Sequence, residues 1–548
     1  MLTKIFKNTK FIWAGLILIT ISIAQTFAFV NNPAIMGKRE VNDERKIVLQ
    51  HADNWNFNDY QYPGAHRLSG NVVFSHAGML MYCDSAVYYV QTNSFEAMGN
   101  VSMHQGDTLT LEGDSLYYDG EAMLAQMRNN VVLTHNLQKP YTDSLNYDRV
   151  DSVGYFFEGG MLVDGDNKLT SDWGEYLVKT KEANFLYGVV LTNPQLKVSS
   201  DTLNYHTTTK WAHVVGQSLI ESGKSYIHTQ NGFYNTDMEI ARLYDRSVII
   251  NGERVMTGDS LFYYKNEGDM MAYGDIDYHD KLNKNLMRGN FACYNELSGE
   301  ALCTDSAVVM DYSNGPDTLY VHADSLKLFS YNMNTDSLWR KLDAYHHVRA
   351  YRKDIQAVCD SLVFTSKKRL MTMYRDPIIW SENRQILGEQ IDIFFNDSTL
   401  DSVYVCRQSL LVEQVDSANF NQVSGHEMRS YYDNGEIKEN QVIGNVRVIF
   451  FPIEKDSLVL YQVYVETSKL RMLMEQRKLD KIWTPPADGK FYALGMAPRE
   501  HKRLENFEWF DYIRPKSKDD IFVWRPKRKG TELKTTIRRQ APLQYLEK

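Results

Sequence analysis

The run from Gly99 to Tyr118, GNVSMHQGDTLTLEGDSLYY, decides the fold of this chain. Its apolar residues alternate with other residues at Val101 and Met103, at Leu109 and Leu111, and at Leu116 and Tyr118. Alternation over short runs that Gly, Asn and Asp interrupt is typical of half-buried strands joined by tight turns. A helical repeat of this length would space its apolar residues by about 3.6 positions, which this run does not do.

Two landmarks of this run recur along the chain with one period. A Gly-Asn-Val-like step returns every 28 to 30 residues, in copies that begin at Gly70, Gly99, Asn129, Gly159 and Gly188, and in weaker copies at Gly216, Arg246 and Gly274. A second signature, which starts with Asp and ends with an aromatic residue, keeps the same period, in copies that begin at Asp84, Asp114, Asp143, Asp172, Asp201 and Asp259. Self-similarity at a fixed period indicates a repeat architecture. The sequence therefore predicts an all-β, solenoid-like stack with a few short strands in each repeat.

Composition agrees with a strand-rich globular protein. The 548 residues are 43% apolar and 24% charged, and 35 Tyr and 24 Phe stand beside only 13 Pro. The net charge of −9 lacks the basic excess of a nucleic-acid binder, so we expect no nucleic-acid partner. Five Cys without a Cys-x-x-Cys pair indicate neither a zinc ribbon nor a full disulfide framework.

Residues 1–30 have the layout of a secretory signal peptide. Three lysines precede the apolar stretch Phe11–Ala24, and small residues up to Ala28 offer a cleavage point. The alternative is an uncleaved N-terminal anchor, because Phe11–Val30 has 20 residues and is just long enough to span a bilayer. Both interpretations send the rest of the chain out of the cytosol.

The repeats predict an order of regions behind this leader. We expect a β-repeat domain over residues 45–285, a divergent junction over 286–345 where the period falters, and a second β-repeat region over 346–450. A C-terminal extension follows over 451–548, in which Ser468–Lys481 is expected to form a short helix.

The end of the extension has a different composition. From Thr484 onward Pro becomes frequent, and 15 Lys and Arg stand against 9 Asp and Glu. This predicts an irregular, solvated tail, basic from 484 and partly disordered. The aromatic block Glu508–Pro515 is an exception, and we expect it to dock elsewhere on the chain.

The repeats carry a resemblance to a known family. The run Gly113–Tyr118, followed by Glu121–Ala125 and Asn129–Val131, resembles the organic-solvent-tolerance (OstA-like) repeat, and Phe95–Val101 and Gly70–Val72 fit the same pattern. The family includes the periplasmic bridge of lipopolysaccharide export and the N-terminal domain of the outer-membrane translocon.

This resemblance implies a β-jelly-roll or β-taco array that holds lipopolysaccharide acyl chains, or those of a related glycolipid, in the periplasm. It also implies other lipopolysaccharide-transport components as partners, bound through exposed end strands that can equally pair with another copy in a homo-oligomer. The chain departs from the pattern because it is much longer than a typical bridge protein. Its place in the export path stays open for that reason.

The alternating residues of the clearest repeats are the candidate lipid-binding set: Val72, Phe74, Val101, Met103, Leu109, Leu111, Leu116, Tyr118, Val131 and Leu133. If each repeat folds over, they line an apolar groove that either stays a packed core or opens to an acyl chain. A group of methionines, Met79, Met81, Met98, Met103, Met123 and Met127, either fills gaps in that core or adapts to acyl chains.

Other conspicuous residues favour structural roles. The repeated Asp is expected to cap turns, because catalysis does not need one copy in each repeat. We expect His76, His104 and His135, and also His346-His347, to form surface rows rather than a metal site. Cys83 and Cys359 occupy one repeat position and are expected to be buried.

No catalytic motif, cofactor site or metal site is expected, because the sequence has no phosphate-binding loop, nucleophile elbow or zinc-binding HExxH motif. The leading hypothesis is a non-enzymatic periplasmic protein that shields lipopolysaccharide acyl chains and passes them toward the outer membrane. The alternatives are a closed β-solenoid scaffold of the envelope and a β-helix enzyme acting on polysaccharide. The last would need one non-repeating pair of carboxylates, which the sequence does not show.

Overall fold

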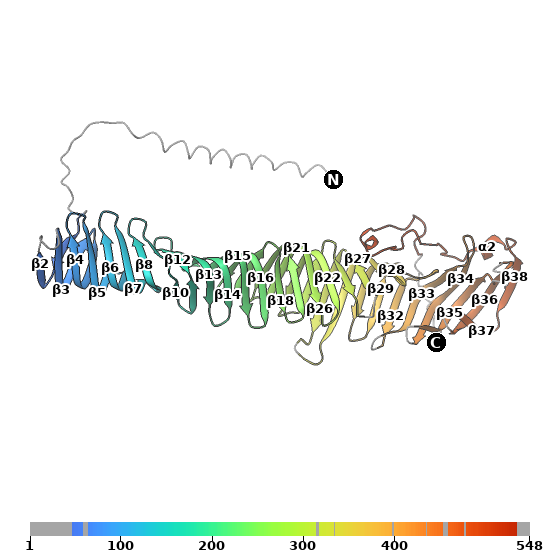
Figure 1. Cartoon of the computed structure of the whole chain (residues 1–548). Coiled ribbons are helices and arrows are strands. Elements are labelled where there is room, and N and C mark those ends of the chain that lie inside the picture. The colour runs from blue at the N-terminus through green and yellow to red at the C-terminus, as the bar shows by residue number, and fades with distance from the viewer. Residues whose placement is uncertain are drawn as a thin grey trace, which may run out of the picture.

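The computed structural model is one long stack of strands (Figure 1). It describes residues 46–57, 64–313, 317–333, 335–396, 399–433, 436–452, 459–475 and 478–533. All strand pairings of the described residues are antiparallel, and sequence neighbours pair along most of the stack. This confirms the predicted all-β repeat array. The expected signal peptide, residues 1–30, lies outside the described residues.

The strands of the first part are β1 (Val48–His51), β2 (Asn54–Phe57), β3 (Ala65–His76), β4 (Met79–Tyr89), β5 (Ser94–Gln105), β6 (Leu109–Asp119), β7 (Leu124–His135), β8 (Gln138–Asp148), β9 (Val153–Phe156), β10 (Gly160–Asp164), β11 (Asn167–Ser171), β12 (Trp173–Leu177), β13 (Glu182–Thr192), β14 (Lys197–His206) and β15 (Trp211–Ser222).

The middle part contains β16 (Ser225–Asn235), β17 (Ile240–Tyr244), β18 (Ser247–Asn251), β19 (Arg254–Gly258), β20 (Ser260–Tyr264), β21 (Asp269–Asp280), β22 (Asn285–Asn295), β23 (Glu300–Thr304), β24 (Val308–Asp311), β25 (Leu319–His322), β26 (Ser325–Tyr331), β27 (Trp339–Arg352), β28 (Ile355–Thr365), β29 (Leu370–Tyr374), β30 (Ile378–Ser381), β31 (Arg384–Leu387) and β32 (Gln390–Phe395).

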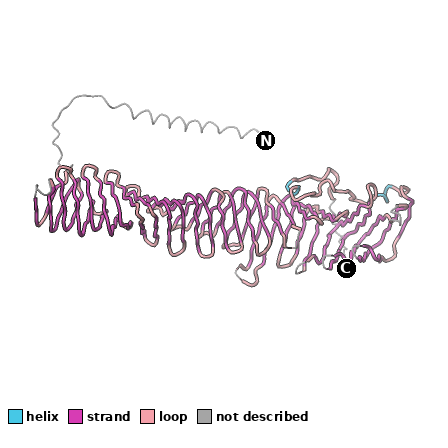
Figure 2. Tube along the Cα trace, in the orientation of Figure 1, coloured by secondary structure: helices cyan, strands magenta, loops and turns pink. Residues whose placement is uncertain are grey.

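The last part contains β33 (Leu400–Gln414), β34 (Phe420–Asp433), β35 (Glu436–Phe450), β36 (Tyr461–Glu475), β37 (Lys478–Trp483) and β38 (Asp488–Ala493). The short helix α2 (Arg499–Lys502) and the 3₁₀ turn η2 (Asp520–Phe522) follow. Figure 2 shows these two turns as the helical pieces of a structure that is otherwise strand and loop.

The long strands that carry a Gly-Asn-Val-like step bend at this step. The pairing of β5 with β6 shifts register between Met98 and Val101, and Gly99 and Asn100 both have positive φ angles, 78° and 43°. Two consecutive residues in this conformation interrupt the ladder as a bulge and turn the strand. The bend repeats at Gly70-Asn71, at Asn129-Asn130 and at Gly444-Asn445. The stack is therefore folded along its length into two arms that meet at a corner.

The repeated Asp lies at this corner and has a structural role, although its partner in the clearest copies is an Asn side chain on the next strand and not the backbone of a turn. Asp84 accepts a hydrogen bond of 2.8 Å from the side-chain amide of Asn100, and Asp114 accepts one of 2.7 Å from that of Asn130. A Cβ at Gly99 would lie 2.5 Å from Asp84 Oδ2, so a larger residue at this position would displace the carboxylate. The two landmarks of the sequence are thus the two halves of one contact.

Two sequence predictions concern the later part of the chain. Strands β22 to β27 run through residues 286–345 without leaving the stack, although the period of the sequence falters there. The helix expected at Ser468–Lys481 is wrong, because this stretch belongs to β36 and β37. Its register on β35 explains the strand: Leu470 is buried in the core opposite Val442, and Met472 packs against that core opposite Asn440. The division into domains stays a prediction.

After β38 the chain turns back along the stack. We call residues 497–525 the return segment; it covers the outer face of β28 to β36 (Figure 1). Phe510 and Ile513 are buried there beside Trp380 and Phe420, so the aromatic block Glu508–Pro515 docks as predicted. Trp380 alternates with the inward residue Ile379, which places the return segment outside the fold rather than between the arms.

Candidate functional site

The ten candidate lipid-binding residues all face inward, as the alternation predicts. Each is between 0% and 3% exposed, and all belong to one apolar core cluster that extends along the stack. Four of the grouped methionines, Met79, Met81, Met103 and Met127, lie in the same core, whereas Met98 is 53% exposed. In this part of the stack the side chains themselves occupy the space between the arms. Ligand contact at the ten positions stays a prediction.

One arm carries an uninterrupted apolar row, which we call the aliphatic column. Strand register places its members side by side from β3 to β33: Phe74, Met81, Met103, Leu111, Leu133, Pro140, Leu162, Leu169, Leu191, Val198, Ile220, Ile227, Ile249, Met256, Tyr278, Met287, Val309, Val321, Ala350, Ala357, Ile379, Ile386 and Leu411.

The other arm carries the tyrosine column, in which the aromatic residue of the repeated signature alternates with a mostly small residue. Its members are Tyr88, Phe95, Tyr118, Ala125, Tyr147, Gly154, Tyr176, Ala183, Tyr205, Ala212, Tyr234, Ala241 and Tyr263. The small neighbours leave room for the rings. The two columns face each other across the space between the arms.

Hydrogen bonds from the tyrosine column join the two arms at their open side. Tyr118 is 2.7 Å from His76 Nδ1, Tyr147 donates to Gln105 Oε1 at 3.2 Å, and Tyr176 is 2.8 Å from His135 Nδ1. These pairs are separated by 42, 42 and 41 residues. The series starts with Tyr88, which donates to the carbonyl of Ile47 at 3.0 Å, and ends with Tyr205, which donates to Asp164 Oδ2 at 2.8 Å. We call these five bonds the tyrosine clasp.

The clasp corrects the prediction for two histidines. His76 and His135 were expected on the surface, but they are 1% and 7% exposed. They continue the inward alternation, since His76 follows Val72 and Phe74 at steps of two. That alternation is the signal that sequence reasoning missed. Burial lowers the pKa of His135, with a further contribution from the charge of Lys181, and burial raises the pKa of Tyr176 to about 12.

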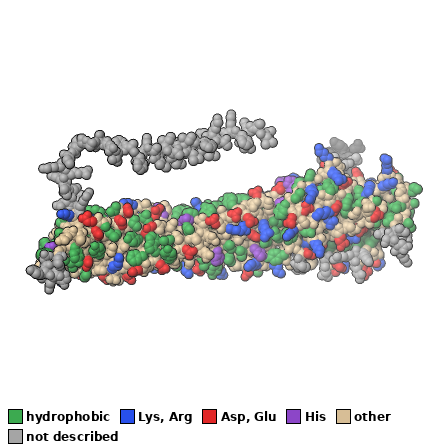
Figure 3. Space-filling view, turned by 45° about the horizontal axis from the view of Figure 1, so that its top comes forward, with side chains coloured by type: hydrophobic (Ala, Val, Ile, Leu, Met, Phe, Trp, Pro, Cys, Tyr) green, Lys and Arg blue, Asp and Glu red, His purple; other side chains and the backbone are tan. Residues whose placement is uncertain are grey.

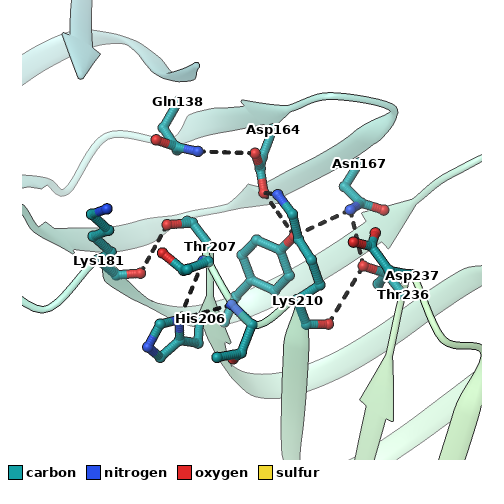
Figure 4. A network of polar contacts seen from close by, with 12 residues as sticks. Gln138, Asp164, Asn167, Lys181, His206, Thr207, Lys210, Thr236 and Asp237 are labelled. Atoms are coloured by element: carbon teal, nitrogen blue, oxygen red, sulfur yellow. Dashed lines mark hydrogen bonds and ion pairs between the residues drawn. The ribbon is translucent and has the colours of Figure 1, made fainter. Parts of the chain in front are cut away.

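The last bond of the clasp belongs to a buried polar network around Asp164 (Figure 4). The Asp164 side chain is 2% exposed and receives Lys210 Nζ at 2.5 Å and Gln138 Nε2 at 3.1 Å in addition to Tyr205. Asn167 extends the network by donating to the Tyr205 hydroxyl at 3.1 Å. A buried carboxylate needs such partners, because an unpaired one would cost several kcal/mol. The network therefore holds both arms together at this level.

Beyond this network the inward rows become partly exposed. Ile220 is still buried, but the following members of the aliphatic column, from Ile227 to Val321, are only half-buried. Tyr234 and Tyr263 are half-buried as well, and Tyr263 bonds to Glu296 of its own arm rather than across. The residues beside the corner, such as Leu261 and Leu326, stay buried. We call residues 65–222 the sealed segment and residues 225–395 the open segment.

The outer surface contrasts with this interior. The face drawn in Figure 3 carries Lys, Arg, Asp and Glu side chains intermixed with apolar and uncharged ones. Many of the charges are paired, as in Arg288 with Asp277 at 3.1 Å and Arg407 with Glu389 at 2.8 Å. The strands thus have a charged outer face and an apolar inner face, which is the pattern of a half-buried sheet.

The other possible sites, which are a cavity, a pair of histidines and two cysteines, lie away from the two columns. A cavity of about 780 Å³ opens at the outer corner beside Tyr374, Arg375 and Leu533. His346 and His347, at the same corner, are exposed and bond to Asp360 and Asp324, and no group of side chains suited to a metal ion occurs in the described ranges. Cys83 and Cys359 are buried as predicted.

Comparison with known proteins agrees with the repeats. No curated protein matches the chain.

In the residues that the structure describes, no helix is long and apolar enough to cross a membrane. Residues 44–201 match the model of a family described as OstA-like protein, and these residues contain most of the sealed segment with four of the five bonds of the tyrosine clasp. Over residues 44–201 the chain is therefore similar to the OstA-like family.

Proposed function

We propose that this chain is a periplasmic lipid-binding transport protein that shields the acyl chains of lipopolysaccharide and passes them toward the outer membrane. The OstA-like match over residues 44–201 supports the proposal, because that family is concerned with lipopolysaccharide transport in general. The observation that carries the proposal is the inward apolar strip, which continues along the stack and becomes partly exposed from Ile227 onward. An exposed strip of Ile, Met and Val between two arms fits hydrocarbon chains.

The transfer needs no covalent chemistry on this chain. We propose that the chain is not an enzyme and takes no cofactor, and that energy for export comes from other components. Partners would pair with the end strands, where Trp55 and Phe57 of β2 and Phe491 of β38 are exposed.

The test is direct binding. The chain without residues 1–30 is purified, and co-purified or added lipopolysaccharide is detected by mass spectrometry. We expect a stoichiometric complex that survives removal of detergent. A folded chain that retains no lipopolysaccharide would reject the proposal.

A second function has an observation in its favour. The ten predicted residues are at most 3% exposed, so the sealed segment is packed like an ordinary protein core. This favours a non-catalytic scaffold or interaction protein of the envelope for that part of the chain. The scaffold predicts no lipid anywhere on the chain, whereas the transport proposal requires lipid at least in the open segment.

A further inference from the structure

The chain shows how it binds a polypeptide, because the return segment lies on its own outer face. Gln385, fully buried, donates to the carbonyl of Glu508 at 2.9 Å and accepts from the amide of Phe510 at 2.9 Å. Gln422 accepts from the amide of Leu504 at 2.9 Å, and Arg349 donates to the carbonyl of Ile513 at 3.1 Å. Buried side chains with donors and acceptors thus satisfy the backbone of the bound segment.

The strip between the arms of the open segment has few such groups, namely the hydroxyls of its tyrosines. The aliphatic column there consists of Ile, Met, Val and Ala with the single Tyr278. The tyrosine column continues through Met270, Tyr294, Ala301, Leu328, Leu342, Phe364, Met371 and Ile393. A peptide placed on this strip would leave its N–H and C=O groups unpaired, since the strand backbones already pair with each other. Hydrocarbon has no such groups to satisfy.

The open segment has a polar edge beside its apolar strip. Two positions beyond the aliphatic column, the strands carry Asn251, Arg254, Asp280, Asn285 and Asp311 side by side. Arg254 is 3.4 Å from Asp280 and half-exposed. A ligand that spans strip and edge must therefore have an apolar part and a polar part.

One end of the strip is closed by the network around Asp164. Lys210 and Tyr205 converge on this carboxylate from the tyrosine arm, and the clasp continues from there toward β3. An apolar chain that follows the strip from Ile386 toward Ile227 meets buried charged and hydrogen-bonded groups at this level. Displacing them would leave an unpaired buried charge, which costs several kcal/mol.

We propose that the acyl-chain site of this protein lies in the open segment, between Ile227 and Ile386, with the Asp164 network as its end wall. The polar edge at Arg254 and Asp280 takes the head group. This inference rests on the proposed function and moves the site away from the ten residues that the sequence singles out. The sealed segment then serves as a rigid, lipid-free extension.

Photo-methionine, which replaces Met with almost unchanged shape, tests the location in the full chain. The labelled protein is incubated with rough-form lipopolysaccharide, irradiated and mapped by mass spectrometry. We expect adducts at Met256 and Met287 in at least about tenfold excess over Met81 and Met103, because apolar contact follows exposure. Exposed Met98, on the outer face, reports non-specific association.

The outcomes separate this inference from the proposed function. Adducts mainly at Met81 and Met103 overturn the location and leave lipid transport standing. Adducts at Met98 alone, or no bound lipopolysaccharide, overturn both.

A matched pair of variants gives a second readout. Ile249 faces the strip and Ile250 the outside of the same strand, and both are half-exposed, so a charge is tolerated at either. Ile249→Glu is expected to weaken lipopolysaccharide binding about tenfold or more and Ile250→Glu less than about twofold. Equal effects of the two changes would contradict the location.

Discussion

The sealed and the open segment are built from the same repeat and differ in what crosses between their arms. In the sealed segment, five tyrosines of the clasp bond to the opposite arm, and the inward residues are buried almost completely. In the open segment Tyr234 and Tyr263 occupy the same column, but Tyr263 bonds within its own arm and the inward residues are half-buried. A few polar groups at the edge thus decide whether an apolar interior is a core or a binding surface.

The largest effect is expected from charge in the sealed core. Leu116→Asp places an unpaired carboxylate among side chains that are at most 3% exposed, which should destabilise the folded chain by about 4 kcal/mol or more. The neighbouring Tyr117→Asp, on the outer face, is the matched control and should change stability by less than about 1 kcal/mol. Thermal unfolding followed by circular dichroism measures both. Comparable losses would mean that the inward face is assigned wrongly.

The next effect concerns the network that separates the two segments. Asp164→Ala removes the common partner of Lys210, Tyr205 and Gln138 and should cost about 3 kcal/mol, since breaking one half of a buried ion pair leaves the other uncompensated. Hydrogen exchange should accelerate in β10 to β15 and stay unchanged in β28 to β36. Unchanged protection around β10 would show that the network does not hold the arms together.

A single bond of the clasp should contribute less. Tyr176→Phe removes one hydroxyl and leaves the buried His135 without its partner, which should cost about 1 to 2 kcal/mol. The control is Tyr187→Phe, because Tyr187 is exposed on the outside. The measurement is local hydrogen exchange of β7 and β12. If Tyr187→Phe has an equal effect, the clasp contributes nothing specific.

The clasp should also depend on pH through His135. Burial, assisted by Lys181, lowers the folded-state pKa of His135, so the folded chain favours the neutral imidazole. The stabilisation is complete above the unfolded pKa, about 6.5, and is lost as the pH falls through the lowered folded value. In another bond of the clasp, Gln105 accepts the hydrogen bond of Tyr147, so Gln can take the place of His135 as the partner of Tyr176. Because Gln does not titrate, His135→Gln should remove this part of the pH dependence. Thermal unfolding between pH 7.5 and 5 compares the two; identical profiles would rule out His135 as the titrating group.

Much of the fold could be predicted because it depends on local chemistry that repeats. The bend uses two residues with positive φ, next to a carboxylate in the early repeats, so Gly99-Asn100 and Asp84 recur with one period and identify the corner. The inward face follows from alternation, which placed Leu116 and Met103 correctly. Strand β36 was missed because the stretch around Leu470 and Met472 is rich in Leu, Met, Lys, Arg and Glu, which favour helices when taken alone.

The site was harder to predict because exposure depends on the distance between the arms and not on residue type. Ile220 and Ile227 are chemically identical neighbours in one column, and only the first is buried. The clasp joins residues 41 or 42 apart, which is not a multiple of the 29-residue period. The side chain that bonds to the tyrosine is His, Gln or Asp in different repeats, so no single residue type in the sequence indicates the clasp.

The difference in solvent exposure between the sealed and the open segment can be measured most directly in the unliganded chain, without any substitution. Hydroxyl-radical labelling followed by mass spectrometry gives an oxidation rate for each methionine, with exposed Met98 as the internal reference. We expect Met256 and Met287 to oxidise at rates approaching that of Met98, while Met81 and Met103 stay protected. Oxidation of Met103 as fast as that of Met287 would contradict the division into a sealed and an open segment.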